Sequence, residues 1–399
     1  MKKRTSQAEI DNIIESLSFK KTEAMTYSKQ AFSTARQKLL PQVFVELSNE
    51  LIMEYYRDGN IKRYRDHVLL AIDGCVHEIP DNNETRKEYG CVRAADGFEM
   101  ARARTGSVYD VENGFLVSSI FEGFESSERD NAKEIIEKTL KLLPENEKKL
   151  FLFDRGYPSM EFIQYFLLLA TMNVNFLMRV PKSFCKEANS TNTNDEWVEI
   201  EITNDRFRKL TSEIAKQALP IGTKLRIRVI NVVLDTGEVE TLITGLDEDE
   251  LPYEEAKMLY FRRWGVETKF DELKNKFQIE NYSGEKPIII EQDYYCTIFL
   301  SNLASLLEKD AQEKFDATKS QRNLKYEEYK INRSILISKF KDNFIHILLE
   351  EDDSKKSYMY DKLISDLSRN VVPVIKGRKY NRKKQKQSNK YSKARKRLF

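Results

Sequence analysis

The chain has 399 residues, of which 40% are hydrophobic and 11% aromatic, a composition typical of a globular protein rather than a disordered one. No apolar run approaches the length of a membrane span, the N-terminal residues predict no export signal, and the four cysteines and three histidines are too scattered for a zinc site. We therefore expect a cytoplasmic protein with reduced thiols and no contact with a membrane.

The net charge of +2 hides a marked asymmetry along the chain. Residues 376–399 hold 12 Lys and Arg and no acid, which leaves 54 basic and 64 acidic residues in the rest, a net charge of −10. We expect this basic tail to be disordered and to bind a polyanion, with nucleic acid ahead of a purely solubilising role.

The first 62 residues predict helices, from Ser28 to Leu40 and from Pro41 to Tyr56. They form either a small DNA-binding module or a helical cap on the main domain. The pattern changes at residues 68–72, a short apolar run that predicts a strand buried on both faces and ending at Asp73.

Residues 80–96 are polar and predict a loop, and two strands follow at 100–111 and 115–121 around a turn at 112–114. A helix is predicted from Glu128 to Leu143. A second buried strand at 150–153 then ends at Asp154, and a helix at 159–172 and a strand at 175–180 come next. Strands joined through helices predict a parallel arrangement, with ligands at the carboxyl ends of the strands.

A β-rich insertion is predicted at about 181–250, and it is followed by a helix that carries a row of polar residues. The apolar residues of this helix, Leu259, Val266, Phe270, Leu273 and Phe277, are spaced to face a core. At about 100° per residue, Tyr260, Arg263, Glu267 and Lys274 form a second stripe beside them. The simpler interpretation is an ordinary solvated ion pair between Arg263 and Glu267.

Asp73, Asp154 and Glu267 are candidates for one acidic site, because two of them end buried strands and the third lies on a helix facing the same sheet. Carboxylates gathered in this way require a cation, and oxygen ligands favour Mg²⁺ or Mn²⁺. Two such ions support phosphoryl transfer. Asp271 is the alternative to Glu267, one turn further along the helix.

These motifs resemble those of bacterial insertion-sequence transposases of the DDE type, which have a ribonuclease H-like core. The chain is most similar to the group with the Tyr-x2-Arg-x3-Glu-x6-Lys signature, matched by the stripe at 260–274. The runs 72–74 and 154–157 match the two upstream acidic motifs, and Gln292-Asp293-Tyr294 is also typical of the group. The resemblance covers about residues 65–305.

The resemblance implies an α/β fold with a ribonuclease H-like mixed sheet flanked by helices, a β-rich insertion before the last catalytic helix, and helical N- and C-terminal parts. Asp73, Asp154 and Glu267 would hold two Mg²⁺ or Mn²⁺ ions. Tyr260, Arg263, Lys274 and Arg155 would contact DNA. The protein would act on double-stranded DNA as a homodimer, cleaving the terminal inverted repeats of the element and joining the 3′ ends to target DNA in the bacterial cytoplasm, near the nucleoid.

This interpretation divides the chain into an N-terminal helical region at 1–62, a catalytic domain at 63–308, a charged helical region at 309–375 and the basic tail at 376–399. Two alternatives stay open. One is a transposase-derived DNA-binding protein without catalysis, and the other is a different ribonuclease H-like nuclease such as a resolvase.

Overall fold

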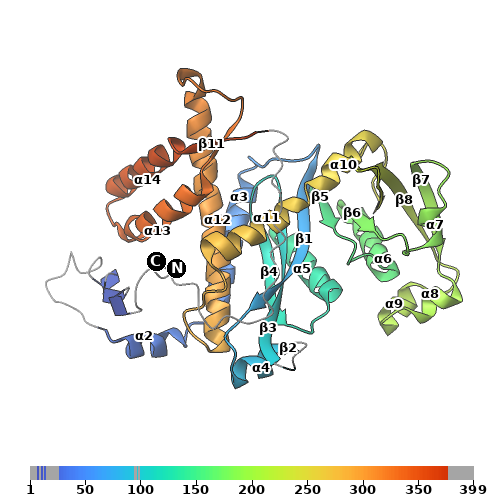
Figure 1. Cartoon of the computed structure of the whole chain (residues 1–399), viewed down its shortest axis with the longest axis horizontal. Coiled ribbons are helices and arrows are strands. Elements are labelled where there is room, and N and C mark those ends of the chain that lie inside the picture. Colours follow the sequence, from blue (N-terminus) through green and yellow to red (C-terminus); the bar gives the residue numbers. More distant parts are fainter. Residues whose placement is uncertain are drawn as a thin grey trace. The chain divides into compact units, whose positions relative to one another are not determined.

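The computed structural model describes residues 27–93, 97 and 99–375, together with the short pieces 7–8, 10–11 and 13–14. These residues form two compact units (Figure 1). One unit comprises residues 49–76 and 104–270 and is called here the sheet unit, and the other comprises 1–48, 77–103 and 271–399 and is called the helical unit. The basic tail lies outside the described residues, so the prediction of its disorder stays a prediction.

The sheet unit is built on strands in the spatial order β3-β1-β5-β6-β9-β8-β7, with β4 paired to β3. The pairs β1–β5 and β5–β6 are parallel, whereas β6–β9, β9–β8 and β8–β7 are antiparallel, so the sheet is mixed. The strands are β1 (His67–Glu78), β3 (Glu99–Asp110), β4 (Leu116–Gly123), β5 (Lys148–Phe153), β6 (Val174–Val180), β7 (Asp195–Glu201), β8 (Lys224–Val233) and β9 (Val239–Thr244).

The parallel strands are almost wholly apolar because both of their faces are buried. Residues 68–72 of β1 and 150–153 of β5 have no exposed surface. Helix α5 (Glu128–Leu142) packs on β4 and α6 (Met160–Leu169) packs on β6, and each begins with a serine whose hydroxyl accepts a backbone amide of the first turn. The short helix η1 (Ala170–Met172) ends α6 before β6 begins.

The insertion between β6 and the next long helices contains the three antiparallel strands β7, β8 and β9 and the short helices α7 (Lys186–Asn189), α8 (Asn204–Arg208) and α9 (Glu213–Ala218). Its core includes the fully buried guanidinium of Arg228, which pairs with Asp195 and donates to the carbonyls of Asp247 and Leu251. After it come α10 (Tyr253–Phe261), α11 (Trp264–Glu272) and the π-helical turn η2 (Leu273–Phe277).

The helical unit is organised around α12 (Pro287–Thr318), against which α13 (Arg333–Leu349) and α14 (Asp353–Ser368) pack. It also contains α2 (Lys29–Arg36), α4 (Asn83–Tyr89), η3 (Lys319–Gln321) and the two-stranded sheet of β10 (Tyr329–Ile331) and β11 (Val371–Pro373). Strand β2 (Cys91–Arg93) pairs with the first residues of β3, and α3 (Gln42–Arg57) follows α2. None of the helices in the described ranges is both long and apolar enough to cross a bilayer.

The structure confirms the helices and strands predicted between residues 28 and 180, and most of their ends lie within two residues of the prediction. Two ends differ by more, because α2 ends at Arg36 rather than at Leu40 and β1 continues to Glu78. Residues 80–96 are not simply a loop, because they contain α4 and β2. The side chain of Asn82 accepts the backbone amide of Thr85 at the start of α4, and the hydroxyl of Thr85 accepts the backbone amide of Asn82. The C-terminal region is not helical throughout either, since β10 and β11 begin and end the segment that carries α13 and α14.

Candidate active site

Two aspartates lie level with each other on neighbouring parallel strands. Residues 67–71 of β1 pair with 148–152 of β5, with Ala71 opposite Leu152. Continuing that register by two residues brings Asp73 level with Asp154, on the same face, because side chains alternate along a strand. The prediction that the first strand ends at Asp73 is wrong, since β1 continues to Glu78; only its pairing with β5 ends before Asp73.

The backbone amide of a glycine that follows each aspartate holds its carboxylate in place. Oδ1 of Asp73 accepts the backbone amide of Gly74 at 2.9 Å, and Oδ1 of Asp154 accepts that of Gly156 at 2.8 Å. A Cβ atom on Gly156 would lie only 3.1 Å from that carboxylate oxygen. The glycine therefore permits the tight turn that orients Asp154 after β5.

Glu267 lies in the first turn of α11, on a helix packed closely against β3. A Cβ atom on Gly265 would lie 3.2 Å from a methyl group of Val111 and 3.4 Å from the ring of Tyr109, so any larger residue would push these neighbours away by a few tenths of an ångström. Val266 is fully buried beside it, whereas the side chain of Glu267 is 38% exposed. The packing thus leaves the Glu267 carboxylate accessible on the site side of the helix.

Arg263 connects the helix to the strand. Its Nη2 donates to Oε1 of Glu267 at 2.7 Å, and its Nη1 lies 3.9 Å from Oδ2 of Asp73. The side chain is only 7% exposed, and its guanidinium lies 5.9 Å from the ring centre of Tyr260 and 5.5 Å from that of Trp264. An ordinary solvated ion pair would not be buried in this way, so the simpler interpretation of Arg263 is wrong.

The expectation of one continuous helix with a straight polar stripe is also wrong. Residues 262–263 form a turn between α10 and α11, where the amides of Arg262 and Arg263 bond three residues back, to Leu259 and Tyr260. The predicted apolar stripe is nevertheless buried along its whole length. The turn at 262–263 and the π-helical turn η2 keep the apolar residues facing the core. They change the direction in which the polar residues of the predicted stripe face.

Lys274 lies in η2 and belongs to the helical unit, unlike the other three signature residues. There its Nζ lies 3.2 Å from Oε1 of Glu280. Asp271, the alternative acid, also belongs to that unit; it is exposed and accepts a hydrogen bond from Asn275 at 2.7 Å. Within the sheet unit, the structure therefore gathers Tyr260, Arg263 and Glu267 with the two aspartates.

The electrostatics of the site centre on Asp73. Burial raises the pKa of Asp73 to about 6, Arg263 and the Gly74 amide oppose the rise, and the charges of Asp154 and Glu267 add to it. Burial also raises the pKa of Tyr260 to about 12, so its phenol is neutral at physiological pH. Asp73 thus feels the charges of both other acids.

The donor set fits a hard divalent cation, because it consists of carboxylates with oxygen atoms alone. Within the described part of the chain, no three Asp, Glu, His or Cys side chains lie close enough together to hold a metal ion as they stand. The positive charge among the acids comes instead from Arg263, which contacts two of them.

A fourth carboxylate, Glu128, lies beside the site and was missed by the sequence reasoning. A Cβ atom on Gly74 would lie 3.7 Å from its Oε1, and one on Gly156 would lie 4.0 Å from its Oε2. Glu128 thus faces the two turns that hold the aspartates, and it pairs with Arg104 on β3. Its position as the first residue of α5 gave no signal, because acids are common in first turns.

The remaining predicted residues have clear surroundings. Arg155 follows Asp154 directly and is exposed. In the helical unit, Arg36 donates to Gln292 at 2.7 Å and to Asp293 at 2.6 Å, so these two residues of the Gln-Asp-Tyr run anchor α2 to α12. His77 is buried edge-on against Tyr294.

The fold and site together define an α/β protein with a mixed sheet and an acidic site at the carboxyl end of its parallel strands, where ligands bind in such folds. Residues 64–303 match the transposase DDE domain family, and the chain belongs to that family. All three predicted acids lie within the matched segment.

Two known proteins illustrate the similarity. Over 241 residues, 59% of this chain, the sequence is 24% identical to the transposase InsG for insertion sequence element IS4 of Escherichia coli (strain K12). The match covers 51% of InsG, so the chain spans about half the length of that relative. A piggyBac transposase, solved as a synaptic complex with hairpin DNA, superposes with a TM-score of 0.42 and 9% identity, covering 75% of this chain and 57% of that one.

Proposed function

We propose that the protein is a DDE transposase that binds the terminal inverted repeats of an insertion sequence as a homodimer, cleaves them and joins the 3′ ends to target DNA. In this proposal the catalytic domain at 63–308 has a ribonuclease H-like core. The observation that carries the proposal is the alignment of Asp73 with Asp154 through the β1–β5 register, with Glu267 tied to Asp73 through Arg263.

Asp73, Asp154 and Glu267 would hold two Mg²⁺ or Mn²⁺ ions. When bound, the ions would activate the attacking oxygen and stabilise the leaving oxygen of a phosphodiester. The carboxylates hold the reacting groups in place, and Gly74 and Gly156 fix the orientation of two of them. Arg263 would then exchange its carboxylate partners for a DNA phosphate.

Arg263 has an unused donor that supports this role. Its Nε is buried and has no hydrogen-bond partner among the described residues. A buried donor without a partner costs about 1–3 kcal/mol. A phosphate oxygen reaching the guanidinium would remove that cost, and the planar fork can hold two such oxygens at once. Tyr260, Arg155 and Lys274 are proposed as further DNA contacts.

The test is single-turnover cleavage of a duplex that carries the element end, with Mg²⁺, by Asp154→Asn and Glu267→Gln. Both variants should keep the fold and DNA binding and lose cleavage. Asp235→Asn is the matched control, because the side chain of Asp235 is 91% exposed and lies in the insertion, outside the acidic site. Wild-type rates in either site variant would refute the assignment. If the wild-type protein binds ends but never cleaves, the alternative of a binding protein without catalysis gains support.

A further inference from the structure

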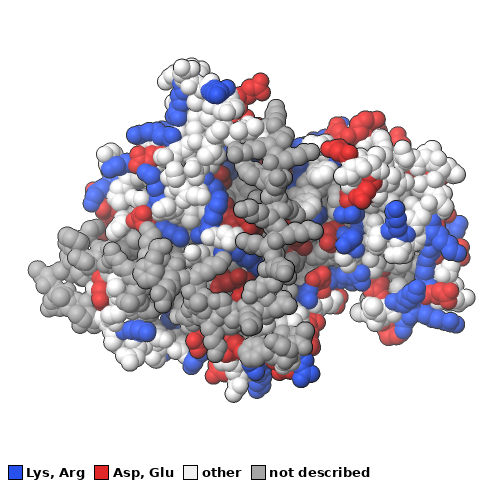
Figure 2. Space-filling view, in the orientation of Figure 1, with Lys and Arg blue, Asp and Glu red and all other residues white. Residues whose placement is uncertain are grey.

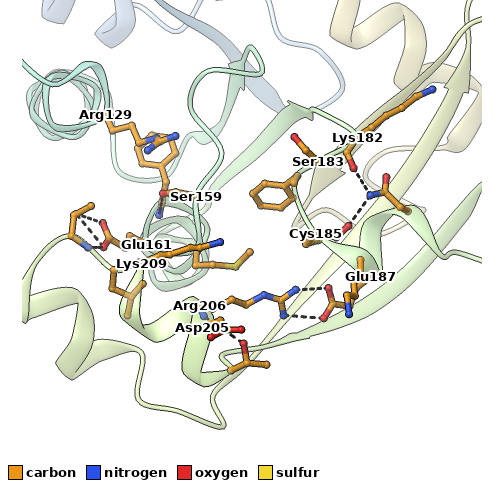
Figure 3. Close-up of a pocket in the computed structure, with 18 of the residues that line it drawn as sticks. Arg129, Ser159, Glu161, Lys182, Ser183, Cys185, Glu187, Asp205, Arg206 and Lys209 are labelled. Carbon is orange, nitrogen blue, oxygen red and sulfur yellow. Dashed lines mark hydrogen bonds and ion pairs between the residues drawn. The ribbon is translucent and has the colours of Figure 1, made fainter.

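A cavity of about 930 Å³ opens in the sheet unit, beside the loop that follows Asp154. One wall comes from the first turns of α5 and α6, and the other from the insertion, at residues 182–189 and 203–211. Figure 3 shows Arg129 and Ser159 on one side, Lys182, Ser183 and Cys185 across from them, and Arg206 and Lys209 lower in the view. We call this cavity the insertion pocket.

The insertion pocket is polar and net positive. Six basic and four acidic side chains line it, a net charge of +2. Two of the four acids already have partners: Glu187 forms a two-pronged pair with Arg206, at 2.9 and 2.7 Å, and Glu161 accepts from the hydroxyl of Thr211 at 2.9 and 3.1 Å. The Glu187–Arg206 pair is neutral as a whole, so the net charge of +2 comes from the other five basic and three acidic side chains.

Arg129 connects the insertion pocket with the loop at 155–158, which follows Asp154 and is called here the catalytic loop. Its guanidinium donates to three successive carbonyls of that loop, those of Tyr157 at 2.9 Å, Gly156 at 3.2 Å and Pro158 at 3.4 Å. Among the described residues it has no carboxylate partner, so its full positive charge stays in the pocket wall. The loop that orients Asp154 through the Gly156 amide thus also holds the guanidinium of Arg129, whose charge has no carboxylate partner among the described residues.

Four lysines of the pocket also lack ion pairs within the described ranges. Other lysines of the insertion are paired, such as Lys216 with Glu213 at 2.7 Å and Lys224 with Glu199 at 2.9 Å. Figure 2 shows Lys and Arg side chains gathered over the part of the insertion that carries α8 and α9. The unpaired amines are those of Lys133, Lys182, Lys186 and Lys209.

We propose that the insertion pocket binds backbone phosphates of the DNA strand that continues past the catalytic acids, and that the insertion supplies the far wall of this phosphate site. The inference rests on the proposed function, because it assumes a DNA strand at Asp154. Cations around an open polar cavity suit phosphodiesters, which attract them without reading the base sequence. The N-terminal ends of α5 and α6 add positive potential to the same wall.

The experiment measures binding of the full chain to a 20-base-pair duplex of arbitrary sequence at several salt concentrations without divalent metal. The double variant Lys182→Ala with Lys209→Ala should bind more weakly and lower the slope of log affinity against log salt by about 1 to 2, since each phosphate contact contributes about 0.9. Both side chains are exposed, so folding should persist, and thermal melting checks it. The control is Lys216→Ala with Lys224→Ala, which removes two paired lysines of the same insertion. An unchanged slope in the pocket variant overturns the proposal.

A second measurement identifies the ligand. In a duplex that carries the element end, which fixes the register of binding, single phosphates are replaced in turn by uncharged methylphosphonates. At one or two positions the replacement should weaken binding by the wild-type protein but not by the pocket variant. If no position behaves in this way and inorganic tripolyphosphate competes only with the wild type, the pocket takes small phosphates and the proposal is wrong. Binding without metal is independent of cleavage, so failure here leaves the test of Asp154 and Glu267 untouched.

Discussion

Nη1 of Arg263 lies 3.9 Å from Oδ2 of Asp73, so a residue from the turn before α11 reaches the carboxylate of a central strand. The same guanidinium holds Glu267 with a different nitrogen. Because one planar group spans two acids from different elements, Arg263 sets their relative positions as well as their charge.

Replacing Arg263 by lysine should therefore impair cleavage although the charge is kept. An ammonium group cannot contact both carboxylates, or two phosphate oxygens, in a fixed geometry. We expect single-turnover cleavage to slow by about a hundredfold, the scale of a misplacement of about 1 Å. Arg208→Lys is the control, since that side chain is 80% exposed on α8. Equal rates in both variants would contradict the role given to Arg263.

Asp73→Asn should stabilise the metal-free protein at neutral pH. The folded-state pKa of about 6 lies above the ordinary 3.8, so the folded state disfavours the carboxylate. This destabilisation is full above pH 6 and vanishes below pH 3.8. Urea unfolding at pH 8 should show a gain of at most about 3 kcal/mol, which shrinks as pH falls from 6 to 4. A gain that is equal at all pH values would have another cause.

Glu128→Gln should raise the Mg²⁺ concentration needed for half-maximal cleavage about fivefold. Removing one charge a few ångströms from the site weakens its attraction for a cation by roughly 1 kcal/mol. The Mg²⁺-induced rise in melting temperature should shrink in parallel. The control is Glu134→Gln on the same helix, whose side chain is 50% exposed and pairs with Lys138. An unaltered Mg²⁺ dependence in Glu128→Gln would leave this residue as a partner of Arg104 alone.

His77 should make the protein sensitive to acid. Burial, and then the nearby Lys274, lower the pKa of His77 to about 3, so it is neutral at pH 7 and forms no ion pair with Glu280, 3.9 Å away. Its stabilising contribution is full above pH 6.5 and is lost as pH falls from 6.5 towards 3. Between pH 7 and pH 5 the wild type should lose about 2 kcal/mol more than His77→Gln. His346→Gln, at an exposed position, should match the wild type.

Deleting residues 376–399 should weaken binding to every DNA sequence alike. The segment holds 12 basic residues and no acid, and such contacts release counterions from DNA. The slope of log affinity against log salt should fall with the deletion, whereas discrimination between end and non-end sequences should not change. If the slope stays the same, the tail serves solubility.

Local features of the sequence predicted much of this molecule. Apolar runs at 68–72 and 150–153 predicted the two central strands, and the turn at 112–114 predicted the β3–β4 hairpin, because burial and turn chemistry act on neighbouring residues. The apolar period through Phe277 also predicted correctly which side of the helix is buried.

Tertiary structure alone decided how those elements meet. The β1–β5 register puts Asp73 level with Asp154, and no periodicity within either strand contains that information. The same holds for Glu128, an ordinary first-turn acid until α5 brings it against Gly74 and Gly156. Arg263 is buried in the turn before α11, and Lys274 lies in η2, which belongs to the helical unit. Spacing along a chain determines which face a side chain occupies, whereas packing between elements determines what it meets there.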